Sequence, residues 1–158
     1  MARLRLYADT SVIGGCEYKE FAYDSGRVVQ GAKDGVYLIL FSDVVLTELA
    51  DAPKAVRKIL TKIPPTAIER VPISDEVHRL REAYIEAGVV SRKSVDDATH
   101  VAAATVAQAD AIVSWNFRHI VRLERIRGYN RINEAHGYRP LTIVSPTEVG
   151  YGKNDEEL

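Results

Sequence analysis

Hydrophobic positions along this chain follow two alternating patterns. Short, largely apolar runs predict β-strands at residues 3–9, 36–42, 111–114 and 141–145. Between them, apolar residues recur every three or four positions, which predicts helices at 24–32, 43–51, 53–62, 75–87, 95–108 and 119–134. Continuous apolar strands suit a sheet that is covered on both faces. The alternation predicts an α/β fold: a three-layer α/β/α sandwich with a mainly parallel central sheet.

Capping residues mark the ends of several predicted helices, and the chain reads as one domain. Ser74 can cap the helix over 75–87, which Gly88 would stop, and Ser94 can cap the helix over 95–108. No repeat or flexible linker divides the chain, and 158 residues suffice for one buried core. We therefore expect one domain over residues 1–149. Residues 150–158 are polar and acidic, which predicts a flexible tail.

Composition and charge exclude several classes of protein. The chain has one cysteine, Cys16, and no clustered histidines, so neither an internal disulfide nor a zinc site is expected. A formal net charge of -1 argues against nucleic-acid binding through bulk positive charge, so any such binding must be local. Without an 18-residue apolar run or a signal-type leader, we expect a cytoplasmic protein with no membrane partner.

Polar side chains occur where predicted strands end or where helices begin beside them. They are Asp9, Glu48, Asp96, Asp97, Ser114 and Asn116. In an open parallel sheet, ligands bind beyond the carboxyl ends of the strands, and connectivity brings all six residues to that edge. Carboxylates without cysteine or histidine ligands suit Mg²⁺ or Mn²⁺. A cation of this kind serves phosphodiester hydrolysis by activating a bound water.

Three of these residues also have structural explanations. Asp9, which precedes a threonine and a serine, can form a side-chain turn. Asp97 lies three residues after Ser94, which suits a short capping box at the positive end of a helix dipole. Asn116 can be the N-cap of the helix predicted over 119–134. Only the convergence of these residues on one edge favours a functional site.

Glu48 and His100 differ in how easily a structural role explains them. Glu48 shares a helix face with Val45 and Leu49, where an unpaired carboxylate is costly unless a cationic group meets it. His100 lies one turn after the two aspartates and could be a general base. A histidine within "DATHVAAA" is more often a packed, hydrogen-bonded core residue, and we favour that interpretation.

Four segments together resemble a PIN domain: "LYADTSVI", "FSDVVLTELADAP", "VDDATHVAAA" and "IVSWNFRHIV". They have the order and spacing of that family, and the resemblance covers about residues 3–149. The fold is found in metal-dependent ribonucleases, among them VapC-type toxins of prokaryotic toxin–antitoxin pairs. The resemblance implies an RNA substrate, a small antitoxin partner and a homodimer.

The resemblance assigns roles to individual residues. The catalytic and metal-binding acids of the family fall on Asp9, Glu48 and Asp97, and the fourth acid falls on Asn116. Ser114 occupies a small hydroxyl position, with Thr10 and Asp96 as further support. Asn116 is a departure, because an amide can offer a ligand oxygen but no negative charge. Catalysis by a single bound metal ion, or weak catalysis, is therefore an alternative to full two-metal catalysis.

A basic stretch follows Asn116 and is the candidate contact for RNA. Arg118, Arg122 and Arg125 fall at i, i+4 and i+7, on one face if the segment is helical, and Tyr129 could stack a base. The alternative is a solvated face of ordinary surface arginines. Two functions remain: a Mg²⁺- or Mn²⁺-dependent endoribonuclease, such as a toxin, or a PIN-like RNA- or protein-binding module with little or no catalysis.

Overall fold

The computed structural model describes residues 2–152. Its strands are β1 (Leu4–Ala8), β2 (Tyr37–Ser42), β3 (Ile68–Val71), β4 (Ala111–Val113) and β5 (Ile143–Val144). Its helices are α1 (Thr10–Gly15), α2 (Ala22–Lys33), α3 (Asp43–Ala50), α4 (Lys54–Thr61), α5 (Asp75–Glu86), α6 (Val95–Val106), α7 (Leu123–Ala135) and α8 (Pro146–Val149). In this part of the chain, no helix is long and apolar enough to cross a membrane.

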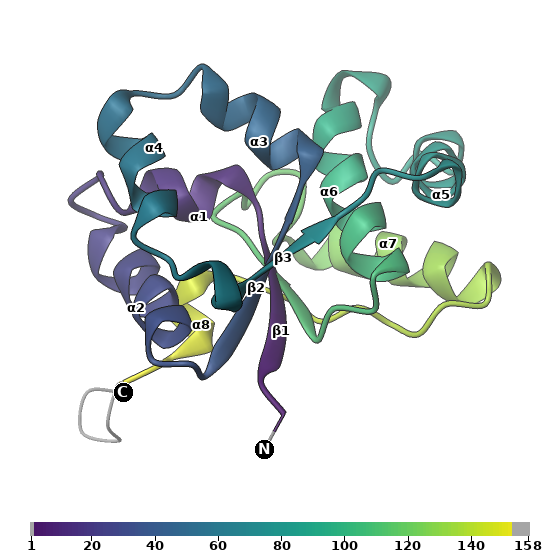
Figure 1. The fold of residues 1–158 in the computed structure, drawn as a ribbon. Coiled ribbons are helices and arrows are strands. Elements are labelled where there is room, and N and C mark those ends of the chain that lie inside the picture. The colour runs from purple at the N-terminus through teal and green to yellow at the C-terminus, as the bar shows by residue number, and fades with distance from the viewer. Residues whose placement is uncertain (1, 153–158) are drawn as a thin grey trace.

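The five strands form one sheet in the order β3-β2-β1-β4-β5, and every neighbouring pair is parallel. Most apolar side chains of the central strand β1 and its neighbours are buried, as expected for a parallel sheet with both faces covered, while Leu4 at the start of β1 is exposed. Helices α1, α2, α4 and α8 lie on one side, and α5, α6 and α7 on the other (Figure 1). The predicted three-layer α/β/α sandwich is confirmed, with an entirely parallel sheet.

The order of the strands creates a switch point between β1 and β4. From β1 the chain builds outward through β2 and β3, then returns to add β4 and β5 on the other side of β1. At such a point the loops leaving adjacent strands diverge, which opens a crevice beyond their carboxyl ends. Asp9 follows β1 and Ser114 follows β4, so both residues lie at this crevice.

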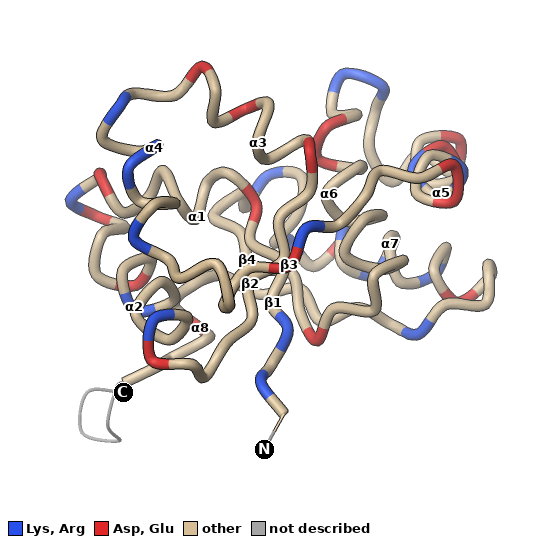
Figure 2. The backbone as a smooth tube through the Cα atoms, viewed as in Figure 1, with Lys and Arg blue, Asp and Glu red and all other residues tan. Residues whose placement is uncertain are grey.

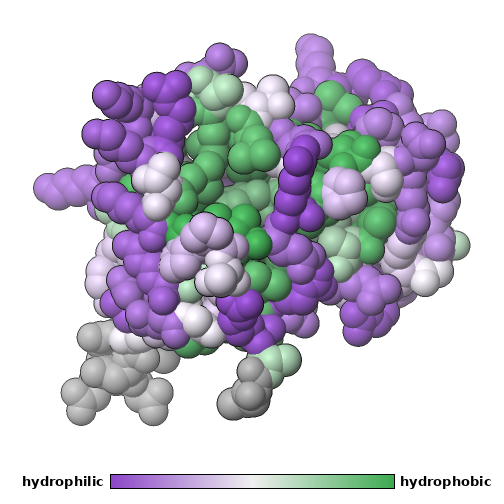
Figure 3. Space-filling model, in the orientation of Figure 1, coloured by the Kyte–Doolittle hydropathy of each residue, from purple (hydrophilic) through white to green (hydrophobic). Residues whose placement is uncertain are grey.

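The outer surface is mixed, with one apolar region visible beside the edge strand. In the view of Figure 1, hydrophobic side chains gather between α4 and β3, and hydrophilic side chains surround them (Figure 3). Strand β3 is the edge of the sheet and pairs only with β2 among the described residues.

Several element boundaries differ from those predicted. Helix α7 begins at Leu123 rather than near residue 119, and α1, α8 and β3 were not predicted. Ser74 caps α5 as predicted, since its hydroxyl accepts a hydrogen bond from the Val77 amide at 3.3 Å. Ser94 occupies the N-cap position of α6 as predicted, but its side chain accepts no capping hydrogen bond.

The packed chain extends past residue 149. The Tyr151 ring lies 5.5 Å from the Tyr37 ring, and its carbonyl accepts a hydrogen bond from Arg27. These contacts anchor Tyr151 against α2 and β2. The rest of the predicted tail, 153–158, lies outside the described residues.

Candidate active site

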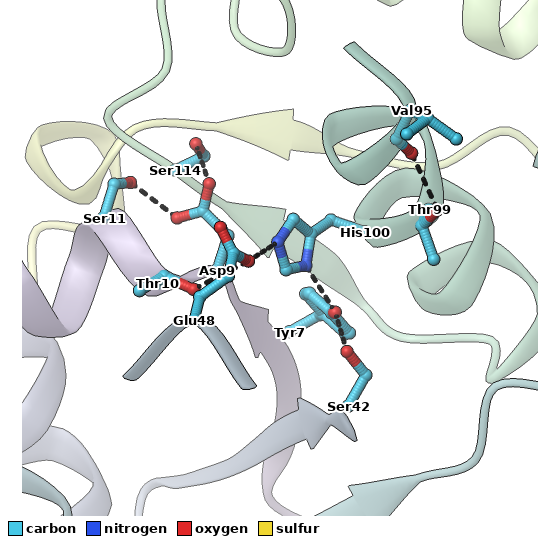
Figure 4. Close-up of polar contacts among 10 residues, drawn as sticks. All are labelled: Tyr7, Asp9, Thr10, Ser11, Ser42, Glu48, Val95, Thr99, His100 and Ser114. Carbon is cyan, nitrogen blue, oxygen red and sulfur yellow. Dashed lines mark hydrogen bonds and ion pairs between the residues drawn. The ribbon is translucent and has the colours of Figure 1, made fainter. Parts of the chain in front are cut away.

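Asp9 lies at the switch point and is almost completely buried, with 4% of its surface exposed. The Ser11 hydroxyl donates to Oδ1 at 2.5 Å, and the Ser114 hydroxyl donates to Oδ2 at 2.6 Å (Figure 4). Burial raises the pKa of Asp9, while the charge of His100 and the two hydroxyl hydrogen bonds oppose that shift. The predicted supporting role of Ser114 corresponds to a direct contact.

Backbone amides fix the two hydroxyls that hold Asp9. The amide of Trp115 donates to Ser11 Oγ at 2.9 Å, and the amide of Asn116 donates to Ser114 Oγ at 2.9 Å. Each hydroxyl therefore accepts one hydrogen bond and donates one to the carboxylate. The loop after β4 thus holds the Asp9 carboxylate in one orientation.

Glu48 projects from α3 toward the same edge, and its side chain is 37% exposed. Its Oε1 accepts from the Thr10 hydroxyl at 3.0 Å and lies 2.7 Å from Nε2 of His100. Partial burial would raise the pKa of Glu48, but the hydrogen bonds from His100 and Thr10 outweigh burial and lower it. The sequence indicated that Glu48 needs a polar partner on this face, and His100 is the buried side chain that meets it.

His100 connects Glu48 to the core through a chain of buried hydrogen bonds, here called the His100 network: Glu48, His100, Tyr7 and Ser42. His100 is 2% exposed, and its Nδ1 lies 2.7 Å from the Tyr7 hydroxyl. That hydroxyl in turn lies 2.6 Å from the Ser42 hydroxyl (Figure 4). The interpretation of His100 as a packed, hydrogen-bonded core residue is confirmed. Burial lowers the pKa of His100, but its hydrogen bond and proximity to Glu48 and nearby acids outweigh burial and raise it.

Asp97 lies in the first turn of α6 and is half-buried, whereas Asp96 beside it is exposed. Burial raises the pKa of Asp97, and the negative charge of Asp9 adds to this effect. The charges of His119 and His100 and a hydrogen bond from Asn116 act in the opposite direction. Asp97 thus belongs to the same electrostatic cluster as Asp9. Asp96 is exposed, so its side chain faces solvent rather than the buried Asp9.

Asn116 uses its side-chain oxygen as a cap. Its Oδ1 accepts from the amides of Arg118 at 3.2 Å and His119 at 2.9 Å. The capping role is confirmed, although the capped segment is the turn over 117–120 and not α7 itself. Because Oδ1 must face those amides, the –NH₂ group is the part available to Asp97. In this orientation Asn116 gives the acids a hydrogen-bond donor rather than a ligand oxygen.

Asp9, Glu48 and Asp97 share one edge of the sheet but do not form a complete set of protein ligands for a metal ion. In residues 2–152, no group of three or more histidine, cysteine, aspartate or glutamate side chains is arranged to hold a metal ion. Both described hydrogen bonds of Glu48 involve Oε1, so Oε2 is left for a ligand. Mg²⁺ usually takes only one or two carboxylates and keeps several waters. The donor set therefore fits a cation held by Asp9 and Glu48 or Asp97 together with water.

The structure corrects the predicted RNA contacts. Arg118 and Arg122 are exposed, but they precede α7 and do not form a helical stripe with Arg125. Arg125 is half-buried, and its guanidinium donates to the Val89 carbonyl at 2.6 Å. Tyr129 is fully buried and donates to the His119 carbonyl, so it cannot stack a base as predicted. Figure 2 shows acidic and basic residues interspersed around the chain rather than one basic face.

Two features of the site were missed from the sequence. One is the contact of His100 with Tyr7, which needs side chains 93 positions apart to meet. The other is the ring of Trp115, which lies 4.5 Å from the Phe21 ring and 6.1 Å from the Phe117 ring. The segment "SWNF", with two aromatic residues at the expected site edge, was the available signal for this second feature.

Comparison with known proteins supports the fold. No protein-family model matches the sequence, and no curated protein sequence matches it. Thirteen chains of solved structures match. One comes from the crystal structure of VapBC2 from Rickettsia felis bound to a DNA fragment from their promoter. It is 14% identical, covers 90% of this chain and 98% of its own, and superposes with a TM-score of 0.54. At this identity the likeness concerns the fold, which is PIN-like.

Proposed function

We propose that this PIN-like domain is a Mg²⁺- or Mn²⁺-dependent endoribonuclease that hydrolyses RNA phosphodiesters. The observation that carries the proposal is the burial of Asp9 at the switch point, close to Glu48 and Asp97. No lysine or arginine forms an ion pair with these three acids in the described part of the chain. Buried acids near one another are costly unless a cation offsets their charge.

The chain's own residues would divide the work between binding and orientation. Asp9 would be the central ligand, because its two serine hydroxyls hold it rigidly while leaving lone pairs on both oxygens. Glu48 would present Oε2, since Thr10 and His100 fix Oε1. Asp97 would complete the acidic edge, with Asn116 orienting it. A bound divalent cation supplies an activated water and stabilises charge on the phosphoryl oxygens.

We further propose that the domain acts as the toxin of a toxin–antitoxin pair. The support is the likeness in fold to a chain of VapBC2 from Rickettsia felis, described there as bound to DNA of their promoter. The partner would be a small antitoxin that covers the acidic edge. A homodimer of this chain remains a prediction, which light scattering of the purified protein can test.

A PIN-like module with little or no catalysis is the second candidate. The orientation of Asn116 favours it, because the fourth position contributes an N–H donor toward Asp97 and no negative charge. Such a module would bind RNA or protein at the same edge. It would hold a single cation weakly, if at all.

Cleavage of a mixed RNA substrate distinguishes the two candidates. The nuclease proposal predicts cleavage in Mn²⁺, none in EDTA, and loss of cleavage in Asp9→Asn and Asp97→Asn. Asp96→Asn is the matched control, because Asp96 is the exposed neighbour of Asp97 on the same helix and should retain activity. Absence of cleavage by the wild-type protein in Mn²⁺ would favour the binding module. Cleavage that persists in Asp9→Asn would contradict the assignment of the site.

A further inference from the structure

Three aromatic rings form a ladder beside the acidic edge. The Phe21 ring lies 4.5 Å from the Trp115 ring at an angle of 34°, and the Phe117 ring meets Trp115 edge-on at 6.1 Å. Phe117 is 52% exposed, so much of its ring is open to a ligand. We refer to Phe21, Trp115 and Phe117 as the aromatic ladder. Nothing in the proposed metal chemistry uses it.

The indole at the centre of the ladder is held rigidly. Its Nε1–H donates to the Ser25 hydroxyl at 2.7 Å. Gly15 lies so close that a Cβ built there would be 2.7 Å from the indole nitrogen, so only glycine permits this approach. A fixed Trp115 supports Phe117 from one side. The exposed ring therefore loses little conformational entropy when a ligand packs on it.

The ladder is tied to the acidic edge through the backbone. The amide of Trp115 donates to Ser11 Oγ, which donates to Asp9, and the amide of Asn116 donates to Ser114 Oγ, which also donates to Asp9. A group resting on Phe117 is thus at a defined position relative to the Asp9 carboxylate. One residue, Asn116, separates Phe117 from Trp115, so Phe117 directly follows the two amides that fix the serine hydroxyls on Asp9.

The chemistry around Phe117 matches a nucleotide. The next residue, Arg118, is exposed and forms no ion pair with the residues that the structure describes. An exposed ring and a free guanidinium can receive a base and its phosphate, respectively. We infer that the aromatic ladder is a stacking site for one unpaired nucleobase next to the scissile phosphate. The inference rests on the proposed nuclease function for the identity of its ligand, and it favours nucleic acid over a protein partner.

A base that stacks on Phe117 must leave its own helix. In a duplex both faces of a base are covered by its neighbours, so only a single-stranded or looped segment can occupy this site. The ladder therefore selects unpaired RNA without recognising its sequence, since every base has a face that can stack.

Trp115 is the only tryptophan in the chain, so its fluorescence reports directly on the ladder. We would titrate the protein in EDTA with a short single-stranded oligoadenylate, its duplex, and a version with abasic sites. The single strand should quench the fluorescence saturably, and the duplex and abasic forms should not. Phe117→Ala should weaken binding about 5- to 150-fold, which corresponds to about 1–3 kcal/mol for one stacked base.

Two further variants separate stacking from general apolar contact. Phe117→Leu keeps an apolar side chain without a ring, so it should bind as weakly as Phe117→Ala. Leu123→Ala removes an equally prominent apolar side chain, 69% exposed, outside the ladder, and it should bind like the wild type. Wild-type affinity in Phe117→Leu, equal binding of the abasic strand, or unquenched fluorescence would each overturn the inference and favour a protein partner.

Working in EDTA keeps this test separate from that of the nuclease. Base stacking is measured where metal-dependent hydrolysis cannot proceed, so quenching without cleavage in Mn²⁺ would support the stacking site and contradict the nuclease. Cleavage in Mn²⁺ without quenching in EDTA would support the nuclease and overturn the stacking site.

Discussion

Replacing Tyr7 with phenylalanine should weaken metal binding without touching an acid. Tyr7 is fully buried, and its hydroxyl lies within hydrogen-bond distance of both Ser42 and His100. Tyr7→Phe keeps the ring and its packing but leaves the two partners without that contact. His100 would then orient Glu48 less firmly, because the Nδ1 side of the imidazole would no longer be held.

The cost in stability follows from the two partners left behind. A buried polar group that loses its partner costs about 1–3 kcal/mol, so two such groups cost about 2–6 kcal/mol. For a domain of this length, that loss lowers Tm by roughly 4–24 °C. Outer-shell partners of metal ligands change metal affinity by about 10- to 100-fold, and for Tyr7, one residue further out, we expect about 10-fold.

Tyr84→Phe is the matched control. Tyr84 is also fully buried, and its hydroxyl contacts Thr105 and Asn133 instead of the His100 network. Both variants should lose stability by similar amounts in thermal unfolding, and only Tyr7→Phe should weaken Mn²⁺ binding in calorimetric titration. Equal Mn²⁺ affinity in the two variants would refute a role for the His100 network in orienting Glu48.

Three further predictions concern the charges of the site. Because the hydrogen bond to Glu48 and the nearby acids outweigh burial and raise the pKa of His100, the native state binds more protons near neutral pH than the unfolded chain. The free energy of unfolding, measured with urea in EDTA, should therefore increase as pH falls from about 8 to about 6, and a flat or opposite trend would contradict this. Asn116→Asp keeps the cap but replaces the amide donor with a carboxylate beside Asp97. The variant should have a lower Tm in EDTA, regain the wild-type Tm in Mn²⁺ and bind Mn²⁺ more tightly. No change in Tm or in Mn²⁺ affinity would leave Asn116 as a cap only. Arg118→Gln and Arg122→Gln should each reduce the slope of log affinity for single-stranded RNA against log salt by roughly 0.7, and an unchanged slope would leave these arginines as solvated surface groups.

Long apolar patterns predicted most of the helices and strands, whereas the short elements α1, α8 and β3 were not predicted from the sequence. Helix α1 was missed because "TSVIGG" contains two β-branched residues and two glycines after its first two residues, all weak helix formers outside their tertiary context. Strand β3, "IERV", has only four residues, two of them charged, so its strand signal in the sequence is weak. Helix α7 starts late because Asn116 caps a separate turn first, which removes the common face predicted for the arginines.

The acids of the site could be placed from connectivity, whereas their partners could not. Asp9 and Glu48 follow strands whose order fixes which edge they reach. The partner of Glu48 is set by how α6 packs against α3, and no local pattern reports that His100 points there. Tyr129 shows the converse error, because an aromatic residue in a basic segment gives no sign of which helix face it occupies.

Binding of Mn²⁺ to the purified protein tests the central claim most directly. Electron paramagnetic resonance of free Mn²⁺ counts bound ions without requiring an RNA substrate. The wild-type protein and Asp96→Asn should each remove about one equivalent of Mn²⁺ from solution, in keeping with a site of one or two carboxylates and water. Asp9→Asn should leave the Mn²⁺ signal undiminished. Equal binding by Asp9→Asn, or no binding by the wild type, would contradict a divalent-metal site built on Asp9.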